Sequence, residues 1–223
     1  MARAWQFPEP VAAIGRALRD YLGGRRSKAQ PVTNRAELRQ FLESRASYVS
    51  QMSLYGYLRT RTGVRFPELF ADNAFVASIN QAKWHIWLAC LSDIAVYAGL
   101  LILRRTNSPV DTVRGFMRSV LDEALTVVGT PADASPEFHA HAERVRARLA
   151  LCDWNALEDD ESAFSESPEA LVRYAPVIDE LKTLDAPIVR NSVRFRWQEV
   201  RRDLRRDLRA EAVLADAAQG AAP

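Results

Sequence analysis

Residues 84–103 read WHIWLACLSDIAVYAGLLIL, with Lys83 before them and Arg104-Arg105 after them. An apolar segment of this length is long enough to cross a bilayer. Asp93 near its centre argues against a membrane span, because a carboxylate there costs about 2.5–3.5 kcal/mol on insertion scales. The helical pattern of apolar residues also continues upstream to residue 73. We therefore expect a buried central helix over 73–105, with a membrane span as the alternative reading.

Helix-breaking residues on both sides of this segment indicate further helices. Ser-Pro pairs begin at Ser108, Ser135 and Ser167, and each predicts a helix start, because serine caps a helix and proline fits its first turn. Gly63 and Gly129 stand where a left-handed residue would end a helix. The predicted helices cover roughly residues 9–22, 35–61, 73–105, 109–128, 136–152, 168–184 and 188–215. Asn34 and Glu37 form a predicted capping box before the second of these, and Pro176 should kink or split the sixth.

No segment shows the alternation of a strand, so the predicted fold class is all-α. We expect a multi-helix bundle of about seven helices around the long apolar central helix. The expected parts are an N-terminal helix and linker over 1–30, a bundle core over 31–187, and a basic amphipathic helix and tail over 188–223. Hydrophobic residues make up 48% of the 223 residues, which is ample for a continuous core.

The charge balance bears on partners and location. Charged residues are 26% of the chain, but the formal net charge is only +2, so no global positive field is present to hold nucleic acid. The N-terminal 24 residues contain prolines and charges that interrupt the apolar run of an export signal. We expect a cytoplasmic protein, with peripheral membrane association as the alternative.

A polar strip runs along the central helix. Ser78, Gln81, His85 and Ser92 fall within about 60° of one another on a helical wheel, and small residues near Gly99 continue the strip. The strip predicts either a ligand groove or hydrogen bonds to neighbouring helices in the core, and we favour the second.

Asp93 lies about 100° away from that strip. A buried carboxylate needs a partner, so we expect an arginine or tyrosine from another helix. The nearest candidates in sequence are Arg59, Arg61 and Arg65.

The most distinctive sequence segment is SLYGYLRTRTGVRFPELF, residues 53–70. Tyr55, Tyr57, Arg59, Arg61 and Arg65 concentrate at the end of one predicted helix. The arginines either complement the helix dipole or recognise an anionic group beside aromatic surface.

The last predicted helix is amphipathic and basic, with an apolar stripe flanked by arginines. Its stripe consists of Val193, Trp197, Val200, Leu204 and Leu208. Acidic residues alternate with the arginines at helix-pair spacing, so we expect a packed stripe under a solvated face. Association with a protein partner or an anionic membrane is the alternative.

Motifs for metal or cofactor chemistry are missing. His139 and His141 are two residues apart, so they point to different sides of a helix, and we expect both on the solvated surface without a metal. The sequence contains no nucleophile elbow, zinc-protease pair, phosphate loop or dinucleotide turn, and no cofactor is expected.

The stretches SLYGYLRTRTGVRFPELF and INQAKWHIWLACLSDIAV, residues 53–70 and 79–96, resemble small uncharacterised helical proteins of α-proteobacteria, some of which are labelled esterases. The resemblance covers about the middle quarter of the chain. It implies a serine hydrolase in which Ser92 or Ser78 is the nucleophile and His85 the base.

Three functional hypotheses follow. The first is a non-enzymatic interaction or assembly protein that binds a protein partner, or a second copy, through the Tyr55–Arg65 patch and the basic C-terminal helix. The second is a small hydrolase with a pocket around His85. The third is a peripheral membrane protein.

Overall fold

The structure is a computed structural model that describes residues 30–220, with side chains described through residue 216. The chain divides into two compact units, residues 1–30 and 31–223. The helix predicted over 9–22 lies outside the described residues.

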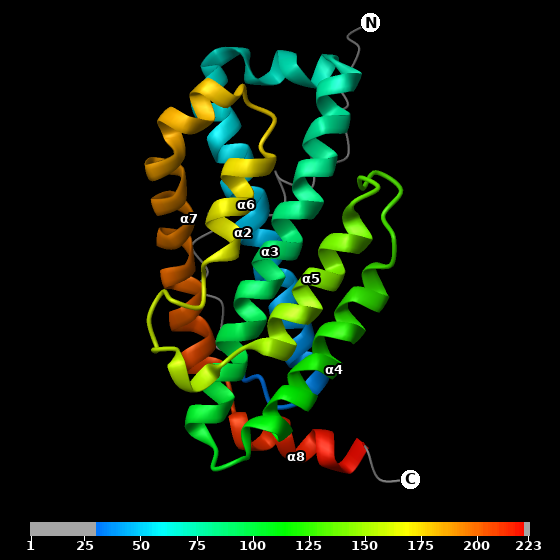
Figure 1. Cartoon of the computed structure of the whole chain (residues 1–223), viewed down its shortest axis with the longest axis vertical. Helices are drawn as coiled ribbons and strands as arrows, with labels where there is room; N and C mark the ends of the chain where they lie inside the picture. Colours follow the sequence, from blue (N-terminus) through cyan, green and yellow to red (C-terminus); the bar gives the residue numbers. More distant parts are fainter. Residues whose placement is uncertain (1–29, 221–223) are drawn as a thin grey trace, which may run out of the picture. The chain divides into compact units, whose positions relative to one another are not determined.

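Helices make up the second unit (Figure 1). Its α-helices are α2 (Arg35–Thr62), α3 (Asn73–Arg105), α4 (Val110–Val128), α5 (Phe138–Leu151), α6 (Glu166–Tyr174), α7 (Asp179–Asp207) and α8 (Ala210–Gly220). Two 3₁₀ helices, η1 (Gly63–Ala71) and η2 (Trp154–Ala156), follow α2 and α5. Between residues 30 and 220 the β-type pairing is a single isolated bridge of Val32 with Leu208. The predicted all-α bundle around a long central helix is confirmed.

The central helix is α3, and its bounds agree with the prediction over 73–105. Every residue from His85 to Ile102 is buried, and α2, α4, α5 and α6 all pack against this helix. By length and composition α3 is apolar enough to cross a membrane, yet 94% of its most apolar window is buried inside the bundle. Neighbouring helices of the same chain therefore bury the apolar run.

Several helix ends follow the predicted local chemistry. Gly63 and Gly129 have φ of +55° and +61°, which only glycine adopts readily, and they end α2 and α4. The Asn34 side chain accepts from the Glu37 backbone N–H at 2.9 Å and caps α2. The Glu37 carboxylate accepts from the Thr33 N–H at 2.7 Å, so the cap is reciprocal but reaches one residue further back than expected. Pro176 does split the predicted sixth helix, because α6 ends at Tyr174 and α7 begins at Asp179.

The helix starts predicted at the Ser-Pro pairs are confirmed to within two residues, but the predicted serine caps are wrong. None of the three serines caps its helix, and α5 begins at Phe138 while α6 begins at Glu166, ahead of Ser167. Two of these serines bond instead to side chains of other elements. Ser135 contacts His85, and Ser167 contacts Asp93 and Trp197. The capping prediction considered only local backbone N–H donors, whereas these hydroxyls bond to side chains of other elements.

The break predicted between residues 184 and 188 is also wrong. Helix α7 runs through Pro187 to Asp207, and the expected domain boundary at residue 188 falls inside it. Pro187 is exposed, while the buried side of α7 continues past it through Ala186, Val189 and Val193. Continuous packing on that side outweighs the one backbone hydrogen bond lost at proline. The helix ends where Leu208 leaves it to pair with Val32, and α8 follows.

The small-residue strip along α3 is filled by the chain itself. The Trp154 ring lies on Gly99, where a Cβ would be only 2.5 Å from the indole. The indole N–H of Trp154 donates to the Val96 carbonyl at 2.8 Å. This half of the strip is therefore a core contact, as the favoured interpretation expected, and not an open groove.

Candidate functional site

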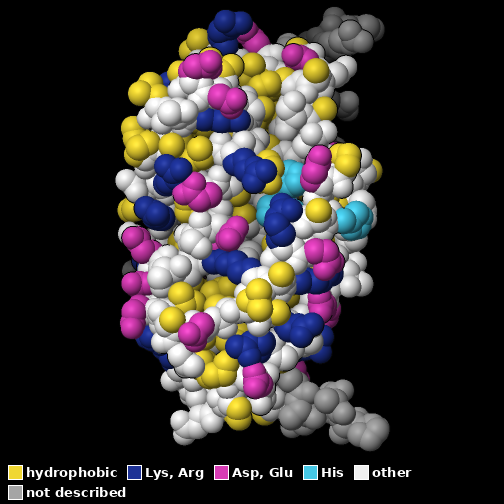
Figure 2. All heavy atoms as spheres, viewed as in Figure 1, with side chains coloured by type: hydrophobic (Ala, Val, Ile, Leu, Met, Phe, Trp, Pro, Cys, Tyr) yellow, Lys and Arg dark blue, Asp and Glu magenta, His cyan; other side chains and the backbone are white. Residues whose placement is uncertain are grey.

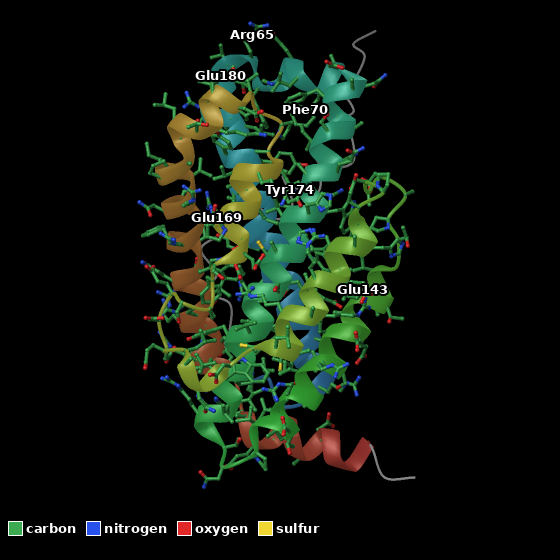
Figure 3. All side chains as sticks on the ribbon, in the orientation of Figure 1. Arg65, Phe70, Glu143, Glu169, Tyr174 and Glu180 are labelled. Atoms are coloured by element: carbon green, nitrogen blue, oxygen red, sulfur yellow. The ribbon has the colours of Figure 1, made fainter. Side chains whose placement is uncertain are left out.

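Two buried histidines meet between α3 and α5. His85 of α3 and His141 of α5 lie with their Nδ1 atoms 2.9 Å apart, and the Nε2 of His85 is 2.8 Å from the Ser135 hydroxyl. The Tyr174 ring stacks on His85 with centroids 4.2 Å apart. Tyr174 is labelled at the end of α6 in Figure 3. We call His85, His141, Ser135 and Tyr174 the histidine cluster. The prediction that His141 is solvated surface is wrong, whereas His139 is exposed as expected and bonds to Thr130.

Hydrogen bonds with exchangeable protons connect His141, His85 and Ser135 of the histidine cluster. One Nδ1 must donate to the other, so the two imidazoles share one proton between them. When His85 donates to His141, its Nε2 accepts from the Ser135 hydroxyl, and in the opposite tautomer every donor is reversed. Hydrogen bonding by Ser135 lowers the pKa of the neighbouring Glu137 carboxyl. Because a hydroxyl has one proton, Ser135 can donate to Glu137 only in the tautomer in which His85 donates to Ser135.

Both imidazoles are held neutral. Burial lowers the pKa of His85 below the ordinary value of 6.5, and burial together with His85 lowers the pKa of His141 to about 4. Arg144 and Arg173 lower both pKa values further, because a cation disfavours a second positive charge nearby. Uncharged at neutral pH, the imidazoles remain available as hydrogen-bond donors and acceptors.

A cavity of about 240 Å³ opens on one side of the cluster. His141 and Tyr174 form its inner wall. The other lining residues are Arg144, Glu166, Glu169, Ala170, Val172 and Arg173. Figure 2 shows this face, where histidine side chains reach the surface between arginine side chains.

The cavity lining contains two arginines and two glutamates, which differ in whether they are paired. Glu169 is held by two hydrogen bonds from Arg190, at 2.6 and 2.8 Å, and Glu166 lies 4.0 Å from Arg148. Arg144 and Arg173 have no salt bridge to a carboxylate within residues 30–216. Arg144 and Arg173 therefore line the cavity without an ion pair in this part of the chain. They lie beside Glu166, whose neighbour Arg148 is already bonded to Asp93.

Asp93 anchors a separate, structural network. It is fully buried and accepts from Arg148 at 2.6 Å, from the Ser167 hydroxyl and N–H at 2.6 and 2.8 Å, and from the Glu166 N–H at 3.1 Å. Burial raises the pKa of Asp93, and these donors oppose that rise. The expected arginine partner is confirmed, but it is Arg148 and none of Arg59, Arg61 and Arg65. The carboxylate caps the start of α6 and so ties α3, α5 and α6 together.

The serines that resemblance pairs with His85 lie elsewhere. Ser92 is buried and accepts from Arg148 at 2.9 Å. Ser78 is exposed and donates to the Ala74 carbonyl of its own helix, and Gln81 is exposed as well. The structure places neither serine against His85, and the serine that contacts it is Ser135.

The Tyr55–Arg65 segment is largely committed to the fold. Tyr55 is buried, and the Tyr57 hydroxyl donates to Asp185 of α7 at 2.8 Å. Arg61 also pairs with Asp185, through two guanidinium nitrogens. Arg59 is exposed, and Arg65 is exposed and pairs with Glu68 at 3.2 Å (Figure 3).

The apolar stripe of the predicted C-terminal helix is packed as expected. Val193, Trp197, Val200, Leu204 and Leu208 are all buried. Several of the arginines beside it are paired internally. Arg190 pairs with Glu169, Arg205 with Asp159, and Arg206 with Asp203 and Asp207.

Sequence reasoning singled out His85 but missed its surroundings. Ser135, Tyr174, Arg144 and Arg173 come from the loop before α5, from α5 and from α6. The one available signal was the pair of positions His141 and Arg144, which share a helix face at a spacing of three. Within the described residues, no group of three or more histidine, cysteine or acidic side chains is placed to hold a metal ion.

Comparisons with known proteins give no relative. No family model matches the chain, and neither the curated proteins nor the solved structures contain a match. The histidine cluster and its cavity are therefore argued from this chain alone.

Proposed function

We propose that the protein binds a small organic anion, a carboxylate or a phosphate monoester, in the cavity beside the histidine cluster. The observation that carries this proposal is the pair of arginines, Arg144 and Arg173, which line the cavity without a carboxylate partner in the described part of the chain. Guanidinium groups bind carboxylate and phosphate oxygens through paired hydrogen bonds. His141 and Tyr174 supply further polar contacts on the inner wall.

Size and polarity narrow the ligand class. A cavity of about 240 Å³ is below the usual range of drug-sized sites, which favours a small metabolite over a nucleotide. Ala170 and Val172 give the lining an apolar side, which suits a short carbon skeleton. The bound anion would also offset the charge of the arginines and so raise the pKa of both imidazoles.

Phosphate titration tests the proposal. Adding inorganic phosphate at constant ionic strength should raise the melting temperature along a saturable curve, with a dissociation constant on the order of 1 mM. Histidine ring resonances followed by NMR should move over the same concentration range. Replacing Arg144→Gln or Arg173→Gln should weaken binding about tenfold, the loss of one charge-assisted hydrogen bond.

The control is Arg118→Gln, which removes an exposed arginine of α4 that is not part of the cavity lining. It should leave the phosphate response unchanged. A response that is linear, or equally strong in the Arg144 and Arg173 variants, contradicts anion binding in this cavity.

Ester hydrolysis is the second candidate function. It is favoured by one observation, the Ser135 hydroxyl 2.8 Å from His85, which in turn contacts His141. In this reaction the Ser135 oxygen would attack the ester carbonyl while His85 takes its proton and passes it to the leaving alcohol, and water would then release the acid. Ser135 does not line the cavity, which is why we rank this function second.

A panel of short-chain nitrophenyl esters separates the two functions. Turnover that disappears in both Ser135→Ala and His85→Ala would establish hydrolysis at the cluster. Absence of turnover, with phosphate binding intact, would leave the anion-binding function alone.

A further inference from the structure

Helix α7 has a second apolar side that the bundle does not cover. Leu184, Ile188 and Phe195 are 72%, 75% and 72% exposed, although each is a large hydrophobic residue. At 100° per residue they lie within about 40° of one another, away from the buried stripe that contains Val193 and Trp197. Single exposed hydrophobic residues are ordinary, but these three share one helix face and form an apolar stripe, which the exposed Asn191 interrupts. In Figures 1 and 2, α7 lies at the edge of the bundle and hydrophobic side chains reach the surface along that edge.

The same face has opposite charges at its two ends. Glu180 lies near the start of α7, where Figure 3 labels it, and Arg202 lies near the end. Both are exposed, and Glu180 has no ion pair among residues 30–216. Arg202 has one long contact, at 3.7 Å, with Glu199 of its own helix. The stripe thus begins acidic, is apolar in the middle and ends basic.

Asn191 stands midway between these charges on the same face, about three helical turns from each. If two α7 helices pack antiparallel with a two-fold axis at Asn191, Glu180 of each copy faces Arg202 of the other. The same register sets Leu184 opposite Gln198 of the second copy, and Ile188 opposite position 194, one residue before Phe195. The two helix dipoles are then antiparallel as well, which favours this direction over the parallel one.

We propose that two copies of this chain associate through α7, antiparallel about Asn191. A second copy is the occupant that the stripe itself specifies, because the charge pattern is complementary to its own reverse. One helix pair buries an area at the low end of specific interfaces, so the dissociation constant should be on the order of 10 μM.

Sedimentation of the full chain across a concentration series measures this constant. Phe195→Asp should weaken association about a hundredfold or abolish it, since it places a charge inside the apolar stripe. Val127→Asp is the matched control, because Val127 is also exposed, at 63%, but lies on α4. Circular dichroism of both variants checks that the helices remain intact.

A charge exchange tests the register. Glu180→Arg alone and Arg202→Glu alone should each weaken association about three- to tenfold, because each change affects two symmetric pairs. The double exchange should restore the original constant to within about twofold.

A cysteine placed at the two-fold axis tests the antiparallel packing independently. In a Cys152→Ser background, Asn191→Cys should form a disulfide-linked dimer on mild oxidation, while Thr183→Cys on another side of α7 should not. A chain that stays monomeric at about 1 mM, or one whose association survives Phe195→Asp, overturns the proposal. Binding to anionic vesicles that is lost in Phe195→Asp, without self-association, would assign the stripe to a membrane surface instead.

Discussion

Gly99 of the central helix lacks a side chain at a position where the packing leaves no room for one. The Trp154 indole occupies the space that a Cβ would need and donates its N–H to a carbonyl of the same helix. Glycine is required there for close approach, because its φ is unremarkable and the helix is regular. A tryptophan from a short 3₁₀ segment thereby joins the core.

Gly99→Ala should destabilise the protein by about 1–3 kcal/mol, because the added methyl group overlaps the Trp154 ring and the buried ring has no free space to move. Urea unfolding at neutral pH measures the free energy. Gly115→Ala is the control, since Gly115 is exposed within α4 with nothing near its Cβ position. It should raise stability by about 0.5–1 kcal/mol through helix propensity. Equal effects of the two substitutions would contradict the close packing at Gly99.

For Asp93, the sequence predicted the type of partner residue but not which residue it would be. The cost of burying a charge required an arginine for Asp93, and one is present, but the sequence favoured the arginines nearest along the chain. Arg148 lies 55 positions away, and only the packing of α5 on α3 brings it close. His141 was misjudged for a related reason, because an α5 residue faces the core or solvent according to how the helix is rotated against its neighbours.

At the scale of elements, the histidine cluster provides the polar contact between α3 and α5. The two imidazoles can be buried side by side only while at least one of them is uncharged. Acid therefore weakens the packing of these two helices once both imidazoles become charged.

We expect stability to fall between pH 6.5 and 4 by on the order of 2 kcal/mol from His141, after allowance for its partial access to solvent. Its folded pKa, about 4, is lower than the ordinary 6.5, so the unfolded chain takes up protons first as the pH falls. Urea unfolding at pH 7 and pH 5 measures the change.

His141→Phe keeps a ring in place but removes the titration, so its stability should depend less steeply on pH over this range. His139→Gln, a change at an exposed position, should preserve the dependence of the original chain. An identical slope in all three proteins would contradict the assignment to His141.

Helix boundaries show where sequence signals suffice. The bounds of α2, α3 and α4 were predicted to within a residue or two, because capping residues, glycine ends and apolar periodicity agreed there. The signals conflicted around Pro176 and Pro187, and only burial decides that the first proline lies between helices while the second lies inside one. The histidine cluster draws on three helices and the loop before α5, so no single local pattern could have revealed all of its members.

At the scale of the whole described bundle, burial is unevenly distributed. Helix α3 is buried along most of its length, whereas η1 contains no buried residue. Local opening should therefore cost nearly the full unfolding free energy in α3 and very little in η1.

Amide hydrogen exchange followed by mass spectrometry should resolve this difference. Peptides from residues 85–102 should exchange roughly a thousandfold more slowly than peptides from residues 63–71. Exchange of the two regions at similar rates would mean that α3 is not the innermost element.

The isolated bridge between Val32 and Leu208 has a consequence for synthesis. Val32 donates to the Asp207 carbonyl, and Arg209 donates back to Val32, both at 2.9 Å. The entry to the first described helix is thus held by residues that the ribosome makes after helices α2 to α6. A chain released before residue 208 lacks this clasp and leaves apolar surface of α2 and α3 uncovered, which chaperones and proteases recognise. The bundle can therefore complete this contact only after residues 207–209 have been synthesised.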